Sequence, residues 1–260
     1  MLSARLENYL LLENKEHLNY VSMAYDEKYF YISTKNLCSI FKIDLSGHIV
    51  DVIKAQDVYK SICFDSVEGC FWAIKNNYSQ YIFKLNKEFN EIDSIVFRET
   101  PYDCIYNIAY KTSDETLLLS GPNFIYNLSK KGEILLKHES HNNNLILSAG
   151  EVGKSLIKCT NCTLSSLIVI NMGYQNYGGG VENLNCLPNG YKPISIFPSC
   201  YSADNNEFFI GTIKNKQFTY LLKYELVNIY NQAIDSKKDI KSSEYYKDDE
   251  FICINDINIL

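Results

Sequence analysis

The feature that most constrains the fold is a short motif that recurs along the chain at a nearly fixed interval. The motif is an apolar residue, any residue, a second apolar residue and a polar residue, as in FKID, and a polar turn with more apolar residues usually follows it. Its copies begin at Phe41, Phe83, Tyr126, Ile168 and Leu222. Successive copies lie about 42 residues apart, except that the inserted stretch GYQNYGGGVEN lengthens the last interval to about 54. A period of this length indicates a repeated supersecondary unit.

A second pattern precedes each copy of the motif. It consists of two apolar segments that flank an acidic turn, as in VSMAYDEKYFYIS. Four of the five copies have an aromatic residue near the end of the first segment, and ILSAGEVGKSLIKC lacks it. Ile, Val, Tyr, Phe and Thr, which favour strands, are abundant in these segments. Each unit is therefore expected to contain four short strands, which we call a to d in chain order.

The two ends of the chain carry parts of one more unit. The tail YYKDDEFICINDINIL (Tyr245–Leu260) aligns with AYDEKYFYIS, and it ends inside a third strand. The N-terminal segment ENYLLL lies one period before strand d of the first unit and has no unit of its own. We therefore expect residues 7–12 to supply the fourth strand of the unit at 243–260, so that the two ends of the chain close a ring.

Such units predict an all-β fold, a six-bladed β-propeller, because radial stacking buries both faces of a four-stranded sheet against its neighbours. A five-bladed propeller with a C-terminal tail is the alternative. Residues 1–260 are expected to form a single domain, with blades at 19–55, 60–97, 105–138, 145–184, 194–234 and 243–260 plus 7–12. The FKIDLSGHIV hairpin resembles in style the blades of NHL-type and lactonase-type propellers, which is a resemblance of fold only. The chain lacks the G-H…W-D pairing of WD40 repeats, since Trp72 is its only tryptophan.

Composition argues against several classes of protein. The net charge is −6 and the isoelectric point is about 5.3, with no polybasic cluster, so nucleic acid is not an expected partner. The nine cysteines follow no disulfide spacing. No apolar run approaches the roughly 18 residues of a membrane span. We expect a cytoplasmic protein with free thiols and no membrane partner, and the excess of Lys, Asn, Ile and Tyr indicates an AT-rich bacterial genome.

In a propeller, the a–b and c–d turns reach one face, and the b–c turns reach the other. Every a–b turn carries acidic residues, and the b–c turns carry amides at Asn36, Asn77, Asn123, Asn161, Asn215 and Asn255. Asp and Asn are common turn formers, which is the simpler interpretation. The alternative is that the repeated turns form rings, one acidic and one rich in amides, whose field steers a charged partner to one face. Lysines in the c–d turns, at Lys87, Lys130 and Lys131, dilute that contrast.

The sequence contains no nucleophile elbow, P-loop or metalloprotease motif, and no catalytic residue is predicted. The lactonase-type resemblance implies an axial metal held by carboxylates and amides, but the acids cluster in turns, so no metal or other cofactor is expected. CTNC (Cys159–Cys162) has the spacing of half a zinc site, and no second such pair exists. HESH (His138–His141) lacks a carboxylate partner motif and is interpreted as a loop, with a metal on its two histidines as the alternative. The inserted loop, with Tyr174 and Tyr177, is the best local candidate for contact with a partner, because long loops in compact domains are often functional.

These observations favour a non-catalytic binding scaffold that uses one face of the propeller to hold a protein or peptide. The candidate binding residues are the six asparagines of the b–c turns together with Tyr174 and Tyr177. Two alternatives stay open. One is a metal-dependent hydrolase or lyase at the axial pocket, which needs several converging carboxylates and amides. The other is a protein that binds a small ligand or a sugar, which needs aromatic walls around a pocket.

Overall fold

The computed structural model describes residues 2–12, 20–76, 80–97, 105–121, 124–139, 146–152, 155–160, 167–171, 182–184, 191–198, 201, 206–214 and 218–228. All regular elements in these ranges are β-strands, β1 to β20. Within the same ranges, no helix is long and apolar enough to cross a membrane.

The described strands form five four-stranded antiparallel sheets. The first sheet contains β2 (Tyr20–Tyr25), β3 (Phe30–Thr34), β4 (Ser39–Ile43) and β5 (Ile49–Lys54), and the second contains β6 (Tyr59–Asp65), β7 (Cys70–Lys75), β8 (Tyr81–Leu85) and β9 (Glu91–Val96). The third contains β10 (Asn107–Lys111), β11 (Thr116–Ser120), β12 (Phe124–Leu128) and β13 (Ile134–Glu139), and the fourth contains β14 (Ile146–Val152), β15 (Ser155–Thr160), β16 (Leu167–Asn171) and β17 (Glu182–Leu184). The fifth contains β18 (Tyr191–Pro198), β19 (Glu207–Lys214), β20 (Phe218–Asn228) and β1 (Leu2–Leu12).

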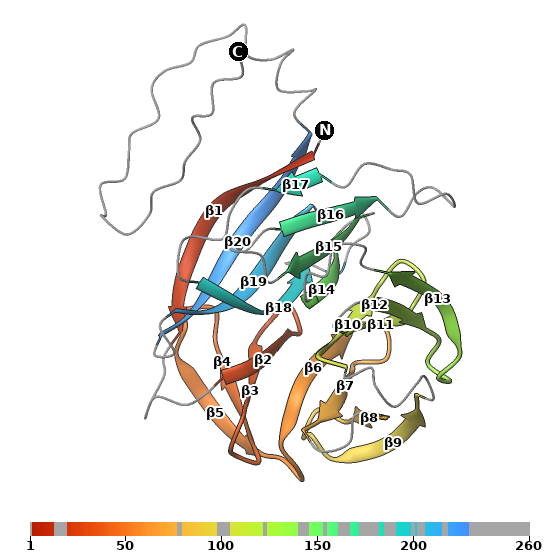
Figure 1. Cartoon of the computed structure of the whole chain (residues 1–260). Helices are drawn as coiled ribbons and strands as arrows, with labels where there is room; N and C mark the ends of the chain where they lie inside the picture. Colours follow the sequence, from red (N-terminus) through yellow and green to blue (C-terminus); the bar gives the residue numbers. More distant parts are fainter. Residues whose placement is uncertain are drawn as a thin grey trace, which may run out of the picture.

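The innermost strands of the five sheets contact one another in a closed ring. In that ring β2 contacts β6, β6 contacts β10, β10 contacts β14, β14 contacts β18, and β18 returns to β2. Figure 1 shows the sheets arranged around this common axis. The prediction of an all-β propeller is therefore confirmed as a class of fold. The six blades are not confirmed, because the described strands close the ring with five sheets and residues 243–260 lie outside the described residues.

The N-terminal strand does close the ring, but not with the partner that the sequence predicted. β1 pairs along its length with β20, with Tyr9 opposite Leu222 and Leu11 opposite Tyr220. Pairing of residues 7–12 with the unit at 243–260 is thus wrong, and residues 243–260 themselves lie outside the described residues. The period identified the N-terminal segment as an outer strand. It could not tell which sheet that strand joins, and the long edge of β20 offers partners for ten residues of β1.

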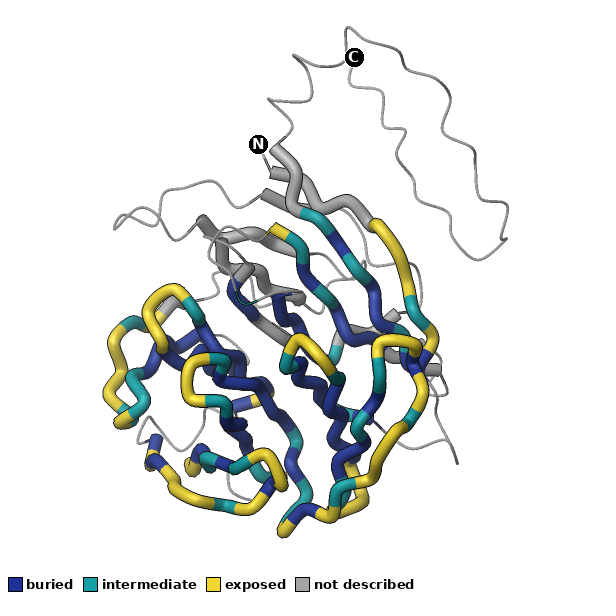
Figure 2. The backbone as a smooth tube through the Cα atoms, turned by 180° about the vertical axis from the view of Figure 1, so that it is seen from behind, coloured by how far each residue is buried: buried dark blue, intermediate teal, exposed yellow. Residues whose placement is uncertain are grey.

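Burial falls from the axis to the rim. Each residue of β10 and β11 is buried, whereas the outer strand β5 exposes most of its residues. Figure 2 shows the same gradient, with buried inner strands and exposed turns and outer strands. The inner strands are apolar along most of their length because neighbouring sheets cover both of their faces.

Three c–d turns share one geometry and pack against the sheet that precedes them. They are residues 44–48, 86–90 and 129–133, and in each the fourth residue has a positive φ: Gly47 at 88°, Phe89 at 59° and Gly132 at 87°. A Cβ added at Gly132 would lie 3.2 Å from the carbonyl oxygen of Val96 in β9. One added at Gly47 would lie 2.7 Å from the carbonyl oxygen of Leu11 in β1. We call the joint between the fifth and first sheets the seam. At the seam, β1 is the outer strand against which the turn packs, as β9 is at the joint between the second and third sheets.

Candidate functional site

The inner strands carry a small polar residue at one repeated position. Ser22, Ser61 and Ser195 each follow a β-bulge in the pairing of the two inner strands, and Asn107 begins β10. All four residues are buried. This row was not predicted from the sequence, although its signal is visible as a serine or asparagine three residues before the aromatic residue in SMAY, SICF and NIAY.

The hydroxyl groups of this row accept hydrogen bonds from the next inner strand. The backbone N–H of Met23 donates to Ser195 Oγ at 2.8 Å, that of Ile62 to Ser22 Oγ at 3.0 Å, and that of Ile108 to Ser61 Oγ at 2.9 Å. Ser22 Oγ also lies 3.2 Å from Ser195 Oγ. Buried polar groups need such partners. These serines therefore join the sheets around the axis, and their hydroxyls are occupied by the protein itself.

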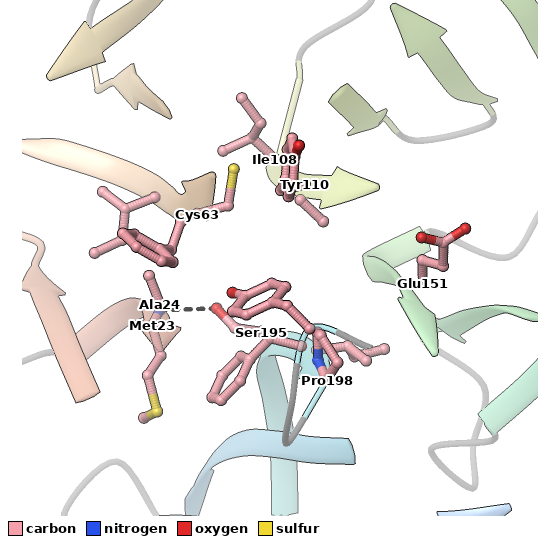
Figure 3. A pocket seen from close by; sticks show the side chains of 14 residues that line it. Met23, Ala24, Cys63, Ile108, Tyr110, Glu151, Ser195 and Pro198 are labelled. Atoms are coloured by element: carbon pink, nitrogen blue, oxygen red, sulfur yellow. Dashed lines mark hydrogen bonds between the residues drawn. The ribbon is translucent and has the colours of Figure 1, made fainter. Parts of the chain in front are cut away.

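The axis ends in a small cavity on the side of the a–b turns (Figure 3). Its volume is about 10 Å³, roughly the space that one water molecule needs. Tyr201 lines it and fixes its own position through two hydrogen bonds, from its hydroxyl to the carbonyl of Tyr25 at 2.8 Å and from its backbone N–H to Glu27 at 2.7 Å. The cavity is too small for an organic substrate in this arrangement.

Glu151 is the only acidic residue among those that line the axial cavity. It occupies the place of the missing aromatic residue in β14, and Figure 3 shows it across the cavity from Met23 and Ala24. Its carboxylate accepts hydrogen bonds from the backbone N–H of Ser113 at 2.9 Å and from the Ser113 hydroxyl at 2.5 Å. The axial lining therefore offers one carboxylate, where an axial metal site needs several oxygen ligands.

A second acidic cluster lies at the joint between the second and third sheets. Asp65, Glu68 and Cys70 place ligand-type atoms within 4.8 Å of one another. However, Lys130 Nζ from the third sheet lies 2.6 Å from Asp65 and 2.9 Å from Glu68, and Lys84 also pairs with Glu68. Burial, and after it the charge of Asp65, raises the pKa of Cys70 to about 11, so its sulfur is a thiol at neutral pH. The cluster is suited to joining two sheets rather than to binding a cation.

The seam contains a larger depression, which we call the seam groove. Its volume is about 450 Å³, within the range of roughly 300–1,000 Å³ that is usual for small-molecule sites. Three rings lie at its floor, where Phe209 stands edge-on to Tyr25 at 5.5 Å and to Phe30 at 5.6 Å between ring centroids. Tyr25 and Phe30 are almost fully buried, at 5% and 1% exposed, so Phe209 is the ring that is most open to the groove. Aromatic walls with a few polar groups are typical of ligand pockets.

Charged and exposed apolar side chains border this floor. Glu207 and Lys223, on adjacent strands of the fifth sheet, form an ion pair of 2.7 Å. Tyr9 of β1 is 44% exposed and Leu45 of the c–d turn is 57% exposed. The groove thus combines an aromatic floor with one carboxylate and one ammonium group.

The structure describes only one of the binding residues predicted from the sequence. Asn36 lies in the b–c turn between β3 and β4 and is exposed. The other predicted residues are outside the described residues: Asn77, Asn123, Asn161, Asn215, Asn255, Tyr174 and Tyr177. An Asn-rich ring and a contact at the inserted loop therefore stay predictions.

Two acidic residues of the a–b turns, Asp26 and Asp65, accept hydrogen bonds from the backbone of their own turns. Asp26 accepts hydrogen bonds from the backbone N–H groups of Lys28 and Tyr29, and Asp65 accepts those of Val67 and Glu68. At these two turns the simpler interpretation, in which Asp is a turn former, explains the residues. The groups that border the seam groove were not found from the sequence, because they come from sheets at opposite ends of the chain.

Comparison with known proteins supports the fold and goes no further. No family model and no curated protein sequence matches this chain. Among solved structures, it is similar to a glutaminyl cyclase from Myxococcus xanthus, with a TM-score of 0.60 at 10% identity over 87% of this chain and 98% of that one. It is also similar to a streptogramin B lyase, with a TM-score of 0.52 at 12% identity over 85% of this chain and 88% of that one. At such identities the similarity establishes a β-propeller fold and leaves the activity open.

Proposed function

We propose that this protein is a non-catalytic binding protein and that its ligand occupies the seam groove. One observation carries the proposal: the contrast between about 450 Å³ of space at the seam and about 10 Å³ at the axis. Phe209 and the exposed side chains of Tyr9 and Leu45 offer an apolar contact surface, and Glu207 and Lys223 offer polar contacts that orient a ligand. A protein partner at the predicted Asn-rich face is compatible with this role, since Asn36, the one described residue of that face, lies in a b–c turn and the groove is bordered by a c–d turn.

The rival function is catalysis at the axis, which one specific feature favours. Glu151 is a buried carboxylate beside the axial cavity, at a position where other inner strands carry an aromatic side chain. Two similar structures bear the names of a cyclase and a lyase. Against this role, the axial cavity holds about one water molecule, and the hydroxyls of the inner strands are bound by backbone N–H groups.

A fragment screen with site-specific blocking separates the two functions. Wild-type protein would be screened by ligand-observed NMR against a library of small neutral and charged fragments. We expect the fragments that bind to lose binding in Leu45→Trp, which fills the groove, and to keep it in Leu37→Trp, an exposed position in the b–c turn of the same sheet. Binding that survives Leu45→Trp but disappears in Glu151→Gln would overturn the proposal in favour of the axial site.

A further inference from the structure

Three outer strands of the propeller carry an Asp or Asn whose side chain accepts a hydrogen bond from the backbone N–H of the next residue. The donors, acceptors and distances are Val52 to Asp51 at 2.7 Å in β5, Ser94 to Asp93 at 2.7 Å in β9, and Tyr9 to Asn8 at 2.8 Å in β1. Each of these strands is the outermost strand of its sheet, so one of its edges is open.

In β5 and β9 the N–H group held in this way points to the open edge. The backbone groups of successive strand residues point to opposite sides. Ala55, three residues after Val52, donates its N–H at 2.9 Å to Cys38 beside the neighbouring strand, and Phe97, three residues after Ser94, makes the corresponding bond at 2.7 Å. The N–H groups of Val52 and Ser94 therefore face away from the neighbouring strand. A carboxylate at that place protects the edge from pairing with another chain.

The outer strand of the third sheet, β13, lacks this protection. The capping residues share one position, opposite the residue of the neighbouring strand at which the register shifts. The opposing pairs at that position are Lys42–Asp51, Lys84–Asp93, Lys223–Asn8 and Asn127–Leu136. Leu136 of β13 carries no charge and no hydrogen-bond acceptor in its side chain. The side chains of the fifth outer strand, β17, lie outside the described residues.

The strand β13 lies at the rim of the propeller and exposes apolar side chains (Figure 1). Ile134 is 38% exposed, Leu135 is 54% exposed and Leu136 is half-buried. Exposed apolar residues alone do not distinguish β13, because Val50 and Val52 of β5 are 50% and 51% exposed. What distinguishes β13 is that its apolar residues include the position at which the other edges carry a capping side chain.

We propose that β13 pairs antiparallel with β13 of a second copy of this chain, about a two-fold axis at Leu136. Lys137 corresponds by register to Val52 and Ser94, so Lys137 and Leu135 direct their N–H and C=O groups to the open edge. The pairing places Leu135 opposite Lys137 of the second copy, where they exchange backbone hydrogen bonds, and Leu136 opposite its own copy. This interface is separate from the seam groove, and the inference does not rest on the proposed function.

Charge favours a second copy at β13 and disfavours it at two other edges. The same two-fold pairing of β5 or β9 would place Asp51 or Asp93 opposite its own copy, and like charges directly opposite each other are destabilising. The paired segment ends before Glu133, whose N–H and C=O are bound to Ser129 within the turn. Because the segment is short, the interface is smaller than those of stable complexes, and we expect a dissociation constant of about 10–100 µM.

Sedimentation equilibrium of the full-length protein at about 0.15 M salt tests this dimer. Leu136→Asp introduces the side chain that β5 and β9 carry and should weaken the dimer at least tenfold. Val50→Asp adds a carboxylate to an exposed position of β5, and as the matched control it should dimerise as the wild type does. A wild type that stays monomeric up to about 1 mM, or equal dimerisation of the two variants, would overturn the inference.

Two variants of the exposed residue Leu135 test the register of the pairing. Leu135→Glu places a carboxylate opposite Lys137 of the second copy, whereas Leu135→Lys places a second ammonium group there. We expect Leu135→Glu to dimerise about tenfold more tightly than Leu135→Lys, because opposite charges across a strand pair attract. Equal dissociation constants would contradict pairing about Leu136. The fluorescence of Trp72, which is buried in the core, checks that each variant is folded.

Discussion

Two joints of this propeller use the same turn and the same aromatic–lysine pair of strands, and they differ in the residue that the turn presents. Between the second and third sheets, Lys130 reaches Asp65, which is completely buried. At the seam, Leu45 stands at the position of Lys130, and a groove of about 450 Å³ remains above the aromatic floor. The same turn therefore presents a largely buried, paired ammonium group at one joint and an exposed apolar side chain at the other.

The comparison also explains why the binding site is not expected at the axis. The hydroxyls of Ser22, Ser61 and Ser195 accept hydrogen bonds from backbone N–H groups of neighbouring inner strands. These polar groups therefore join the sheets and are not available to a ligand. The seam has the same outer architecture as the other joint, but its two sides come from opposite ends of the chain. Variation at the seam alters a single joint and leaves the ring of inner strands intact.

We call the joint between the second and third sheets the filled joint, because Lys130 pairs there with Asp65 and Glu68. The largest effect on stability is expected from removing the ammonium group of Lys130. Lys130→Met leaves the buried carboxylate of Asp65 without its ammonium partner, and removing one member of such a pair costs about 3 kcal/mol of unfolding free energy. Lys131→Met, at the exposed neighbouring position of the same turn, is the matched control and should change little. Urea unfolding followed by Trp72 fluorescence measures both, and equal stabilities of the two variants would show that Lys130 does not hold this joint.

The next effect compares the two glycines that approach the preceding sheet. An alanine side chain at Gly47 would meet the Leu11 carbonyl oxygen at 2.7 Å, whereas at Gly132 it would meet that of Val96 at 3.2 Å. Both positions have positive φ, which costs alanine about 1–2 kcal/mol. Gly47→Ala should therefore destabilise the protein more than Gly132→Ala, by about 1 kcal/mol beyond the shared cost.

Thermal unfolding of the two glycine variants also tests the position of β1. The extra cost at Gly47 arises only if β1 lies beside β20 and against this turn. Identical melting temperatures of Gly47→Ala and Gly132→Ala would mean that β1 does not lie against the turn at 44–48. The seam groove, which β1 borders, would then not exist as described.

Much of the fold could be predicted from the sequence, because polar turns and apolar strand segments recur at a nearly fixed interval. DLSGH, NKEFN and SKKGE look dissimilar, yet all three form the same turn, since Asp44, Asn86 and Ser129 each accept backbone hydrogen bonds from their own turn. Phe89 shows how far the turn tolerates change: it takes the positive φ that glycine has elsewhere and buries its ring 4.5 Å from that of Phe71.

The seam groove could not be found in the same way. The period places residues 7–12 in an outer strand and is silent about which sheet receives it, so the neighbours of Leu45 were unknown. The exchange of Lys130 for Leu45 is visible in the sequence, but it acquires meaning only when Glu207 and Phe209 are known to lie opposite that turn. Pairing between distant segments is the information that a repeat does not contain.

A smaller effect is the dependence of the unfolding free energy on pH, to which Glu68 of the filled joint contributes. Hydrogen bonds from Lys84 and then Lys130 lower the pKa of Glu68 below its usual 4.5. A carboxyl group whose pKa is lowered by folding adds stability above its unfolded pKa and loses that contribution as the pH falls through the folded pKa. Because the Glu68 side chain is 36% exposed, we expect its contribution to be under about 1 kcal/mol.

Urea midpoints of the wild type and Glu68→Gln measure this contribution. The wild type should be the more stable at about pH 6, and the difference should shrink as the pH falls well below the usual pKa of a glutamate. A difference that stays constant down to about pH 2.5 would contradict an ionised Glu68 in the joint.

The smallest effect is expected from converting the seam into the filled joint. Leu45→Lys adds an ion pair with Glu207 at a partly exposed position, which should stabilise the protein by about 0.5 kcal/mol relative to Leu45→Met. Differential scanning calorimetry at low salt measures the difference, which should decrease as salt screens the pair. A lower melting temperature for Leu45→Lys than for Leu45→Met would indicate that the repulsion from Lys223 dominates.

A crystal structure of Leu45→Lys tests the comparison of the two joints most directly. We expect the introduced ammonium group to lie about 3 Å from the Glu207 carboxylate, as Lys130 lies beside Glu68, and the seam groove to be filled. An introduced lysine that extends into solvent above an unchanged groove would contradict it.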